Sequence, residues 1–336
     1  MIITLSESAT SSDIEAICKA LSAGSYSASE VRTQFGRYLV AIGSSEIDIR
    51  SIGSLPGIKD VHRVSDSYKL VSKKWKVSPS TVKLGNGIEI AGGGFTIIAG
   101  PCSIESEEQV RSIAAHLKET GVSIMRGGAF KPRTSPYTFR GLGLEGLKMF
   151  HAIARDSGMK VISEVVATAD IEAMYDYVDI YQVGTRNTQN FNLLHELGRI
   201  DKPVMIKRGM SGTLDELLQS AEYVFSNGNE ALLLCERGIR TFEKAYRNTL
   251  DLNSVPVLKE KSHLPVIVDP SHGIGIRRFV EPMSLAAVMA GADGVIYEVH
   301  PAPEDALSDA DQTLNFEESS VLVNRARQCA ALRDGF

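Results

Sequence analysis

Residues 126–141 read RGGAFKPRTSPYTFRG, and this stretch indicates the kind of fold around it. Its four cations, with no acid among them, are Arg126, Lys131, Arg133 and Arg140. An apolar, β-favouring run ends at Met125 just before it, and a helical pattern begins shortly after it, so we expect a loop that leaves the carboxyl end of a strand. Guanidinium groups bind phosphate or carboxylate bidentately, and prolines and glycines fix the shape of a loop. This loop is therefore predicted to bind small anions rather than to be a merely solvated basic segment.

The alternation of apolar runs and helical patterns continues over the rest of the chain. The predicted strands are 95–99, 122–125, 160–163, 180–183, 204–206, 231–234, 266–268 and 294–297. Helical patterns fill most of the gaps, although the connection 237–264 is longer and less regular. Eight strands with interleaved helices over roughly 240 residues are typical of an α/β fold closed into a (β/α)8, or TIM, barrel. We assign this barrel to residues 94–336.

A smaller unit is predicted before the barrel. Residues 1–66 show the element order βαββαβ, which is typical of a ferredoxin-like (ACT-like) domain. The pattern alone leaves two roles open, a ligand-sensing regulatory domain and an oligomerisation or stability module. Residues 67–93 form a linker, whose Trp75 we expect to pack on the barrel, followed by a β-hairpin around Gly85-Asn86-Gly87. That hairpin could close the amino end of the barrel.

Composition narrows the classes of function. The net charge of −5 over 336 residues gives no support to nucleic-acid binding. The first residues lack the basic region of a secretory leader, and no apolar run approaches the ~20 residues of a membrane span, so no membrane partner is expected. The four cysteines are far apart without CxxC pairing, which favours a reducing cytoplasm.

Cations and potential metal ligands follow the ends of the predicted strands. The cations are Arg126, Lys131, Arg133, Arg186, Lys207 and Arg237. Their convergence at one cavity mouth would be costly without anionic ligands, which favours two phosphate-bearing substrates or one phosphate and a carboxylate. The potential metal ligands are Cys102, His272, Glu298 and Asp309. They follow strands 1, 7 and 8, which are neighbours in a closed barrel, and one thiolate, one imidazole and two carboxylates suit a divalent ion such as Mn²⁺, Fe²⁺, Co²⁺ or Zn²⁺.

Seven motifs in the chain resemble those of one enzyme family. They are IAGPCSIES (98–106), GGAFKPRTSPYTFRG (127–141), QVGTRNTQN (182–190), IKRG (206–209), LLLCERGIRTFE (232–243), VDPSHG (268–273) and EVHP (298–301). Together they resemble the 3-deoxy-D-arabino-heptulosonate 7-phosphate (DAHP) synthases, in the short type I form with an amino-terminal ferredoxin-like regulatory domain. The resemblance covers almost the whole chain.

This resemblance implies a transferase that condenses phosphoenolpyruvate with erythrose 4-phosphate, the first step of the shikimate pathway. It implies that Cys102, His272, Glu298 and Asp309 bind the divalent metal, for which Mn²⁺ is the first choice. It also implies that phosphoenolpyruvate is bound by Arg126, Lys131, Arg186, Lys207 and Arg237, and erythrose 4-phosphate by Arg133 and Thr134 with Lys131, Pro132 and Asp269 near its carbon chain. The candidates for direct catalysis are Lys131, Cys102 and His272, and Lys131, crowded by neighbouring arginines, is a candidate proton donor.

Regulation and assembly are implied as well, and two alternative functions remain open. The resemblance implies a homotetramer that tyrosine or phenylalanine inhibits through the small domains. One alternative is 3-deoxy-D-manno-octulosonate 8-phosphate synthase, which uses arabinose 5-phosphate; its loop reads Lys-Ala-Asn-Arg, whereas only Pro132 separates Lys131 from Arg133 here. The other is a non-catalytic, effector-binding barrel. The sequence after His272, Gly273-Ile274-Gly275, departs from the family pattern and is expected to be a loop.

Overall fold

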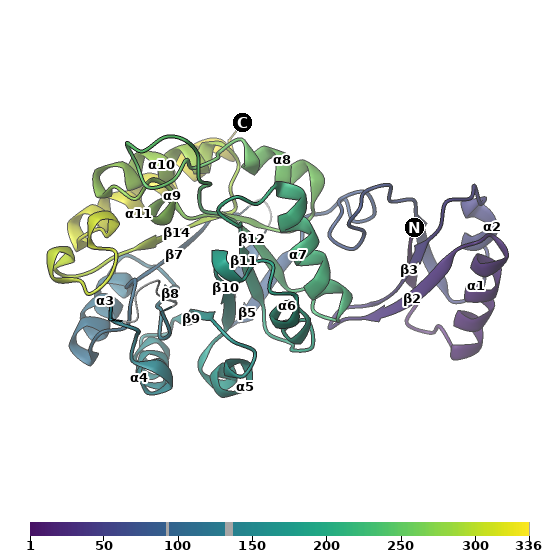
Figure 1. Ribbon diagram of the computed structural model, residues 1–336, viewed down its shortest axis with the longest axis horizontal. Helices are drawn as coiled ribbons and strands as arrows, with labels where there is room; N and C mark the ends of the chain where they lie inside the picture. Colours follow the sequence, from purple (N-terminus) through teal and green to yellow (C-terminus); the bar gives the residue numbers. More distant parts are fainter. Residues whose placement is uncertain (92–93, 132–136, 336) are drawn as a thin grey trace.

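The chain folds into two units of different size, joined by a linker (Figure 1). The structure is a computed structural model that describes residues 1–91, 94–131 and 137–335. The larger unit is a closed barrel with helices around it, and the smaller unit lies beside it and holds the amino-terminal residues.

The smaller unit is a four-stranded antiparallel sheet with two helices. Its elements are β1 (Ile2–Leu5), α1 (Ser11–Ala23), β2 (Ser27–Arg32), β3 (Arg37–Ile42), α2 (Ile49–Gly53) and β4 (Ile58–His62). The strand order is β2-β3-β1-β4, with β1 in the middle pairing β3 and β4. Helix α1 begins at a capping box formed by Thr10 and Asp13, and it buries Ile17 and Leu21 against the sheet. The predicted ferredoxin-like order is confirmed.

Eight parallel strands close the barrel. They are β7 (Thr96–Gly100), β8 (Ile124–Arg126), β9 (Lys160–Val165), β10 (Ile180–Val183), β11 (Val204–Lys207), β12 (Leu232–Glu236), β13 (Val266–Val268) and β14 (Gly294–Glu298). Each strand pairs with the next, and β14 pairs with β7 to complete the ring. This confirms the predicted (β/α)8 barrel, strand for strand.

Helices surround the barrel strands and bury one face against them. They are α3 (Glu107–Glu119), α4 (Gly143–Asp156), α5 (Asp170–Met174), α6 (Phe191–Leu197), α7 (Leu214–Ser226), α8 (Ser254–Lys261), α9 (Pro270–Ile274), α10 (Arg277–Met289) and α11 (Phe316–Arg333). A large apolar core fills the layer between these helices and the strands. Within the described ranges, no helix is both long and apolar enough to cross a membrane.

A β-hairpin closes the amino end of the barrel, as predicted. Strands β5 (Thr81–Gly85) and β6 (Ile88–Ala91) are joined through Asn86 and Gly87, both with positive φ, as a primed turn requires. Val82, Leu84 and Ile90 of the hairpin pack in one cluster with inward-facing strand residues, among them Ile98, Ile124, Ile180 and Ile267. The barrel interior at this end is therefore filled by apolar side chains.

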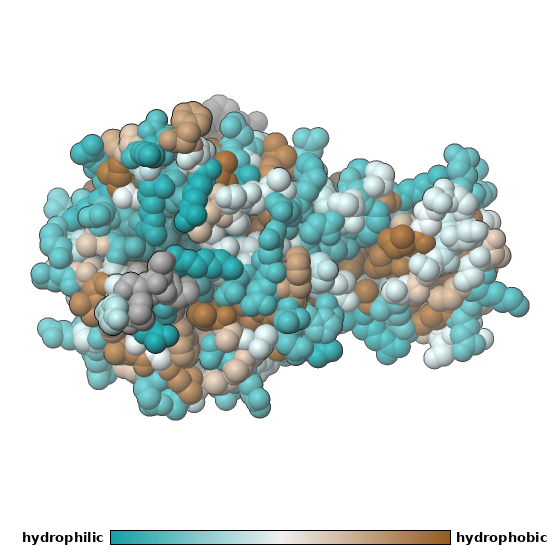
Figure 2. Space-filling model, in the orientation of Figure 1, coloured by the Kyte–Doolittle hydropathy of each residue, from teal (hydrophilic) through white to brown (hydrophobic). Residues whose placement is uncertain are grey.

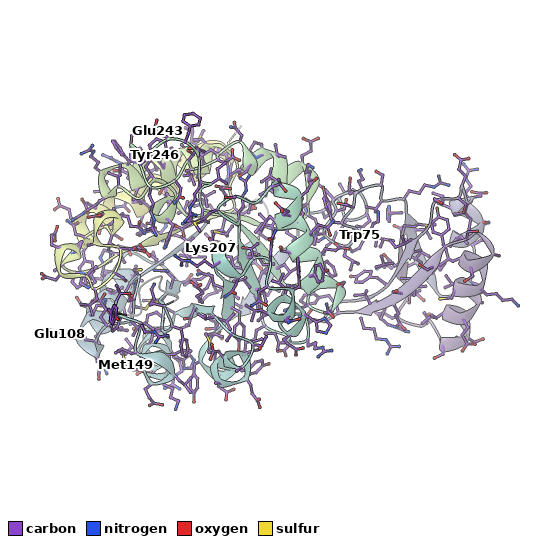
Figure 3. All side chains as sticks on the ribbon, in the orientation of Figure 1. Trp75, Glu108, Met149, Lys207, Glu243 and Tyr246 are labelled. Atoms are coloured by element: carbon purple, nitrogen blue, oxygen red, sulfur yellow. The ribbon has the colours of Figure 1, made fainter. Side chains whose placement is uncertain are left out.

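An aromatic cluster joins the small unit and the linker to the barrel. The rings around Trp75 are Tyr38 of β3, Phe225 of α7 and His263, with centroids at 5.2, 6.4 and 5.7 Å. The Tyr38 hydroxyl donates a 2.9 Å hydrogen bond to Glu230, which lies just before β12. Figure 3 places Trp75 between the two units. The prediction that Trp75 packs on the barrel is confirmed.

Candidate functional site

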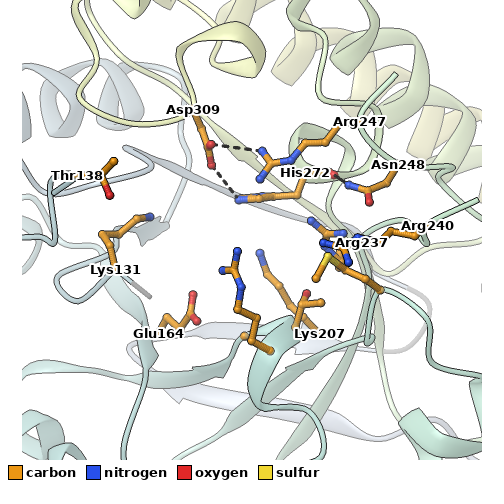
Figure 4. Close-up of a pocket in the computed structure, with 14 residues that line it drawn as sticks. Lys131, Thr138, Glu164, Lys207, Arg237, Arg240, Arg247, Asn248, His272 and Asp309 are labelled. Atoms are coloured by element: carbon orange, nitrogen blue, oxygen red, sulfur yellow. Dashed lines mark hydrogen bonds and ion pairs between the residues drawn. The ribbon is translucent and has the colours of Figure 1, made fainter. Parts of the chain in front are cut away.

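A cavity of about 480 Å³ opens at the carboxyl ends of the barrel strands. Its volume is in the range of small-molecule sites. Ten of its lining residues, labelled in Figure 4, are Lys131, Thr138, Glu164, Lys207, Arg237, Arg240, Arg247, Asn248, His272 and Asp309. Figure 2 shows hydrophilic side chains around the hollow in the barrel unit, and Figure 3 places Lys207 in the middle of the barrel. Polar groups at this end suit a polar, charged ligand.

The cations predicted from the strand ends meet at this cavity. Lys131, Arg186, Lys207 and Arg237 line it. Arg126 is 5% exposed and lies beneath the cavity, where its Nη1 donates to Glu298 Oε1 at 3.0 Å and to a backbone carbonyl. Burial lowers the pKa of Arg237, which is 4% exposed. An anion bound here would offset the cost of keeping these buried charges together.

Three of the four predicted metal ligands form one compact group. One ligand atom each from Cys102, Glu298 and Asp309 lies within 4.8 Å of the others. The pairing of Glu298 with Gly100 across β14 and β7 brings the Cys102 segment next to Glu298. The Cys102 thiol donates to Asp309 Oδ2 at 3.4 Å. Strand closure therefore assembles ligands that are about 200 residues apart in the sequence.

His272, the fourth predicted ligand, projects from a short helix that continues to Ile274, so Gly273 and Ile274, for which the sequence predicts a loop, are helical. Helix α9 begins after Asp269, whose side chain accepts a hydrogen bond from the His272 backbone N–H, and Pro270 occupies its first turn. Both features favour a helix start, which the expectation of a loop overlooked. The helix ends at Gly275, whose φ of +69° suits glycine. His272 Nε2 then lies 3.4 Å from Glu298 Oε1 and 3.6 Å from Asp309 Oδ2.

The donor set fits a divalent cation. His272 Nδ1 is 2.8 Å from the Asp269 carboxylate, which holds a proton at Nδ1 and leaves Nε2 as the ring nitrogen that a metal could bind. Nε2 faces carboxylate oxygens of Glu298 and Asp309, so a cation between these three groups would be held by one nitrogen and two oxygens. Burial, with the nearby charge of Glu298, raises the pKa of the Cys102 thiol to about 11. A metal bound there must therefore displace the thiol proton.

Lys131 connects the metal-ligand group to the cavity. Its ammonium donates to the Cys102 carbonyl at 2.9 Å and lies 3.1 Å from the Cys102 sulfur. Burial opposes ionisation of Asp309, but His272, Arg247 and Lys131 outweigh it and lower the pKa of that carboxyl to about 2. Lys131 thus presents a proton donor beside the predicted metal ligands.

Three predicted substrate-binding residues, Pro132, Arg133 and Thr134, lie outside the described residues. Asp269, also predicted, is buried beneath the cavity and forms an ion pair with Lys207. The structure therefore brings together the predicted phosphoenolpyruvate and metal residues.

Several residues of the cavity wall were not predicted. Glu164 lies one residue before the end of β9; the strand-end pattern reaches it, but residue type alone gave it no role. A Cβ at Gly184 would lie 2.0 Å from Glu164 Oε1, so glycine there leaves room for this carboxylate. Arg240, Arg247 and Asn248 come from the irregular connection after β12, where no periodic pattern indicated which side chains face the cavity.

Comparisons with known proteins agree on one family. The sequence model of the DAHP synthetase I family matches residues 75–331. The phospho-2-dehydro-3-deoxyheptonate aldolase of Thermotoga maritima is 45% identical over 341 residues, covering 98% of each chain. The 2-dehydro-3-deoxyphosphooctonate aldolase of Syntrophotalea carbinolica is 32% identical over 262 residues, covering 71% of this chain and 92% of the relative.

Solved structures extend the likeness to three dimensions. A crystal structure of the DAHP synthase of Thermotoga maritima is similar with a TM-score of 0.79 and 44% identity, covering 99% of this chain and 98% of that one. A truncated form of 3-deoxy-D-arabino-heptulosonate 7-phosphate synthase from the same organism has a TM-score of 0.75 and 46% identity. The similar region spans 80% of this chain and 98% of the truncated one.

Proposed function

The chain belongs to the DAHP synthetase I family and is an enzyme of the transferase class, and from this premise we propose how its cavity performs the condensation of phosphoenolpyruvate with erythrose 4-phosphate. The observation that carries the proposal is a single cavity lined by six cations, with His272 and Asp309 of the metal-ligand group in its wall and Cys102 and Glu298 in contact with them. The first set suits anionic substrates and the second a divalent metal. The products are DAHP and phosphate, at the entry to the shikimate pathway.

Phosphoenolpyruvate would bind to the cations on the cavity wall and floor. Arg186, Lys207 and Arg237 supply the charges for its phosphate and carboxylate, with Lys131 beside them and Arg126 beneath. Guanidinium groups hold such oxyanions in fixed orientations, which positions the enol carbon for attack. Arg133 and Thr134 would hold the phosphate of erythrose 4-phosphate, and Pro132 and Asp269 would lie near its carbon chain, as the family pattern implies.

Cys102, His272, Glu298 and Asp309 would hold the metal, for which we propose Mn²⁺, with Fe²⁺, Co²⁺ or Zn²⁺ as alternatives. When bound, such an ion acts as a Lewis acid on the aldehyde oxygen of the sugar phosphate. Asp269 fixes the tautomer of His272 that presents Nε2 to the ion. Asp269 would therefore contribute to metal affinity through His272, although it is not itself a metal ligand.

The chain's own residues would guide each bond change. Carbon C3 of phosphoenolpyruvate forms a bond to the aldehyde carbon, and the aldehyde oxygen takes a proton, for which the Lys131 ammonium is the candidate donor. The C2=C3 electron pair forms that bond and leaves C2 electron-poor, so water adds at C2 and gives up a proton that would restore the Lys131 ammonium. The new C2 hydroxyl then loses its proton as the C2–O bond to the phosphate group breaks, which leaves a ketone at C2 and releases phosphate. Arg186 and Arg237 would stabilise the charge of the departing phosphate.

We also propose that residues 1–66 are regulatory, that tyrosine or phenylalanine is the effector, and that the protein works as a cytoplasmic homotetramer. The ferredoxin-like order of the small unit fits both roles that its pattern leaves open, and the resemblance to the short type I form favours the regulatory one. The truncated Thermotoga structure, which corresponds to 80% of this chain, supports a barrel that can be separated from other parts.

A turnover assay on metal-stripped, full-length protein tests the proposal. Phosphoenolpyruvate is supplied with either erythrose 4-phosphate or arabinose 5-phosphate, before and after Mn²⁺ is added back, and phosphate release is measured. We expect metal-dependent turnover with the four-carbon sugar alone. Turnover with arabinose 5-phosphate would show the octulosonate activity instead, and no turnover with either sugar would favour a non-catalytic barrel.

A further inference from the structure

Arg247 is a cation beside the metal-ligand group that the proposed chemistry leaves without a role. It lies in the connection between β12 and α8, and its guanidinium points at Asp309, with Nη1 3.3 Å from Oδ1 (Figure 4). The side chain lines the cavity and is 40% exposed, so it is not locked in place by packing. It contacts a carboxylate that the metal would also need.

The stretch that departs from the family pattern places Arg247 at this position. The Arg247 backbone N–H donates to the Ile274 carbonyl at 3.1 Å. A Cβ at Gly275 would lie 2.3 Å from the Arg247 Cβ, and Gly275 has a φ of +69°. Glycine at 275 therefore both ends helix α9 and leaves room for the Arg247 stem.

Gln312 extends the contact to a second metal-ligand carboxylate. This side chain is 2% exposed; its carbonyl oxygen accepts from Arg247 Nη1 at 2.6 Å, and its amide donates to Glu298 Oε2 at 2.6 Å. Arg247 thus acts on Asp309 directly and on Glu298 through Gln312. The single positive charge of the Arg247 guanidinium therefore neutralises part of the negative charge of Asp309 and Glu298, which a divalent ion would also bind.

We propose that Arg247 competes with the metal for Asp309 and that, once the metal binds, its guanidinium turns into the cavity and binds an anionic group of the substrate. A divalent ion bonded to the Asp309 carboxylate would lie close to a guanidinium 3.3 Å from that carboxylate, and like charges at such separations repel strongly. The exposed side chain can relieve this repulsion by turning toward a phosphate or carboxylate, its preferred partners. Metal and anionic substrate then strengthen each other's binding, because coupling between two ligands is reciprocal.

This inference rests on the proposed metal site, and Mn²⁺ titration monitored by electron paramagnetic resonance separates the two. The Mn²⁺ affinity of the metal-stripped, full-length parent protein is compared with that of Arg247→Met, both without substrate. Methionine removes the charge and keeps an unbranched side chain. We expect Arg247→Met to bind Mn²⁺ about tenfold more tightly, and Arg247→Lys to stay near the parent protein. Arg240→Met is the matched control, since it removes a cation from the same cavity wall, and it should change Mn²⁺ affinity by less than about threefold because the effect is screened with distance.

A second titration tests the substrate half of the proposal. Phosphoenolpyruvate binding is measured by calorimetry with and without Mn²⁺; the gain in affinity that Mn²⁺ produces in the parent protein should be largely lost in Arg247→Met. Unchanged or weaker Mn²⁺ binding by Arg247→Met, or an unchanged gain, would overturn the inference while leaving the metal site intact. A parent protein without measurable Mn²⁺ binding would overturn the metal site itself.

Discussion

The two ends of the barrel are formed by the same eight strands, yet their residues are opposite in kind. At the carboxyl end, buried charges meet around the cavity, among them Arg126, Lys207 and Glu298, each no more than 5% exposed. At the amino end, apolar residues of the β5–β6 hairpin fill the interior and an aromatic cluster holds the linker and the small unit. The clustered cations therefore lie at one end and the apolar filling of the barrel at the other, although the amino end also buries the paired carboxylates of Glu230 and Asp293.

This separation implies that the two ends respond differently to mutation. A substitution at the carboxyl end that removes a cavity charge without leaving a buried ion-pair partner alone should lower activity more than stability. A substitution at the amino end removes packing or a satisfied buried polar group, so it should lower stability more than activity. Three measurements test whether the ends are as independent as the structure indicates.

The largest expected effect is that of Lys131→Met at the carboxyl end. Loss of the proposed proton donor should lower kcat by about 10²–10⁴-fold at saturating substrate, with little change in the free energy of unfolding. Phosphate release and urea unfolding measure the two quantities. Lys76→Met is the matched control at the amino end, where Lys76 Nζ lies 3.9 Å from Glu230, and it should leave kcat unchanged. Full activity of Lys131→Met at saturating substrate would remove Lys131 from the mechanism.

An intermediate effect is expected from His263 at the amino end, through the pH dependence of stability. His263 is 2% exposed, with Nδ1 2.8 Å from the Ser80 hydroxyl and Nε2 2.9 Å from the Leu70 carbonyl. Burial, and to a smaller extent the nearby charge of Lys76, lowers the pKa of His263 to about 3. Protonation therefore favours the unfolded chain, where the pKa is about 6.5. Its contribution to stability is complete above pH 6.5 and is lost as the pH falls toward 3.

The carboxyl end titrates in a different window, which makes the comparison possible. The pKa of Asp309 is lowered to about 2, so its contribution to stability is lost only as the pH falls from about 4 toward 2. When the pH is lowered from 7.5 to 5.0, we therefore expect the buried His263 to lower the free energy of unfolding by about 2 kcal/mol. Urea unfolding of the parent protein and of His263→Gln at both pH values measures it. The loss should be smaller in His263→Gln, whereas His62→Gln, on strand β4, should behave like the parent; equal losses in all three would contradict the assignment.

Sequence patterns were sufficient for the fold and for which residues gather at the cavity, but not for the contacts that support them. A closed barrel brings all strand ends to one side, so residue type and position at a strand end predicted Cys102, Glu298 and the cavity cations without knowledge of side-chain geometry. The contact between Arg247 and Asp309 depends on the path of an irregular connection, which no periodicity indicates. The hydrogen bond between Tyr38 and Glu230 likewise depends on how the small unit meets the barrel.

The smallest expected effect is that of Tyr38→Phe, which tests whether the junction at the amino end is only structural. The substitution removes the Tyr38 hydroxyl that donates to Glu230, while the Thr33 hydroxyl keeps its 2.8 Å hydrogen bond to the same carboxylate. Because the Glu230 oxygen stays paired and the Tyr38 ring keeps its place against Trp75, the loss should be about 1 kcal/mol of unfolding free energy, with kcat unchanged. Tyr26→Phe is the matched control: its hydroxyl donates to the Ser45 carbonyl within the exposed part of the small unit, so its loss should cost less than that of Tyr38. A change in kcat for Tyr38→Phe with intact folding would mean that the junction transmits the position of the small unit to the cavity, and the two ends of the barrel would then be coupled rather than separate.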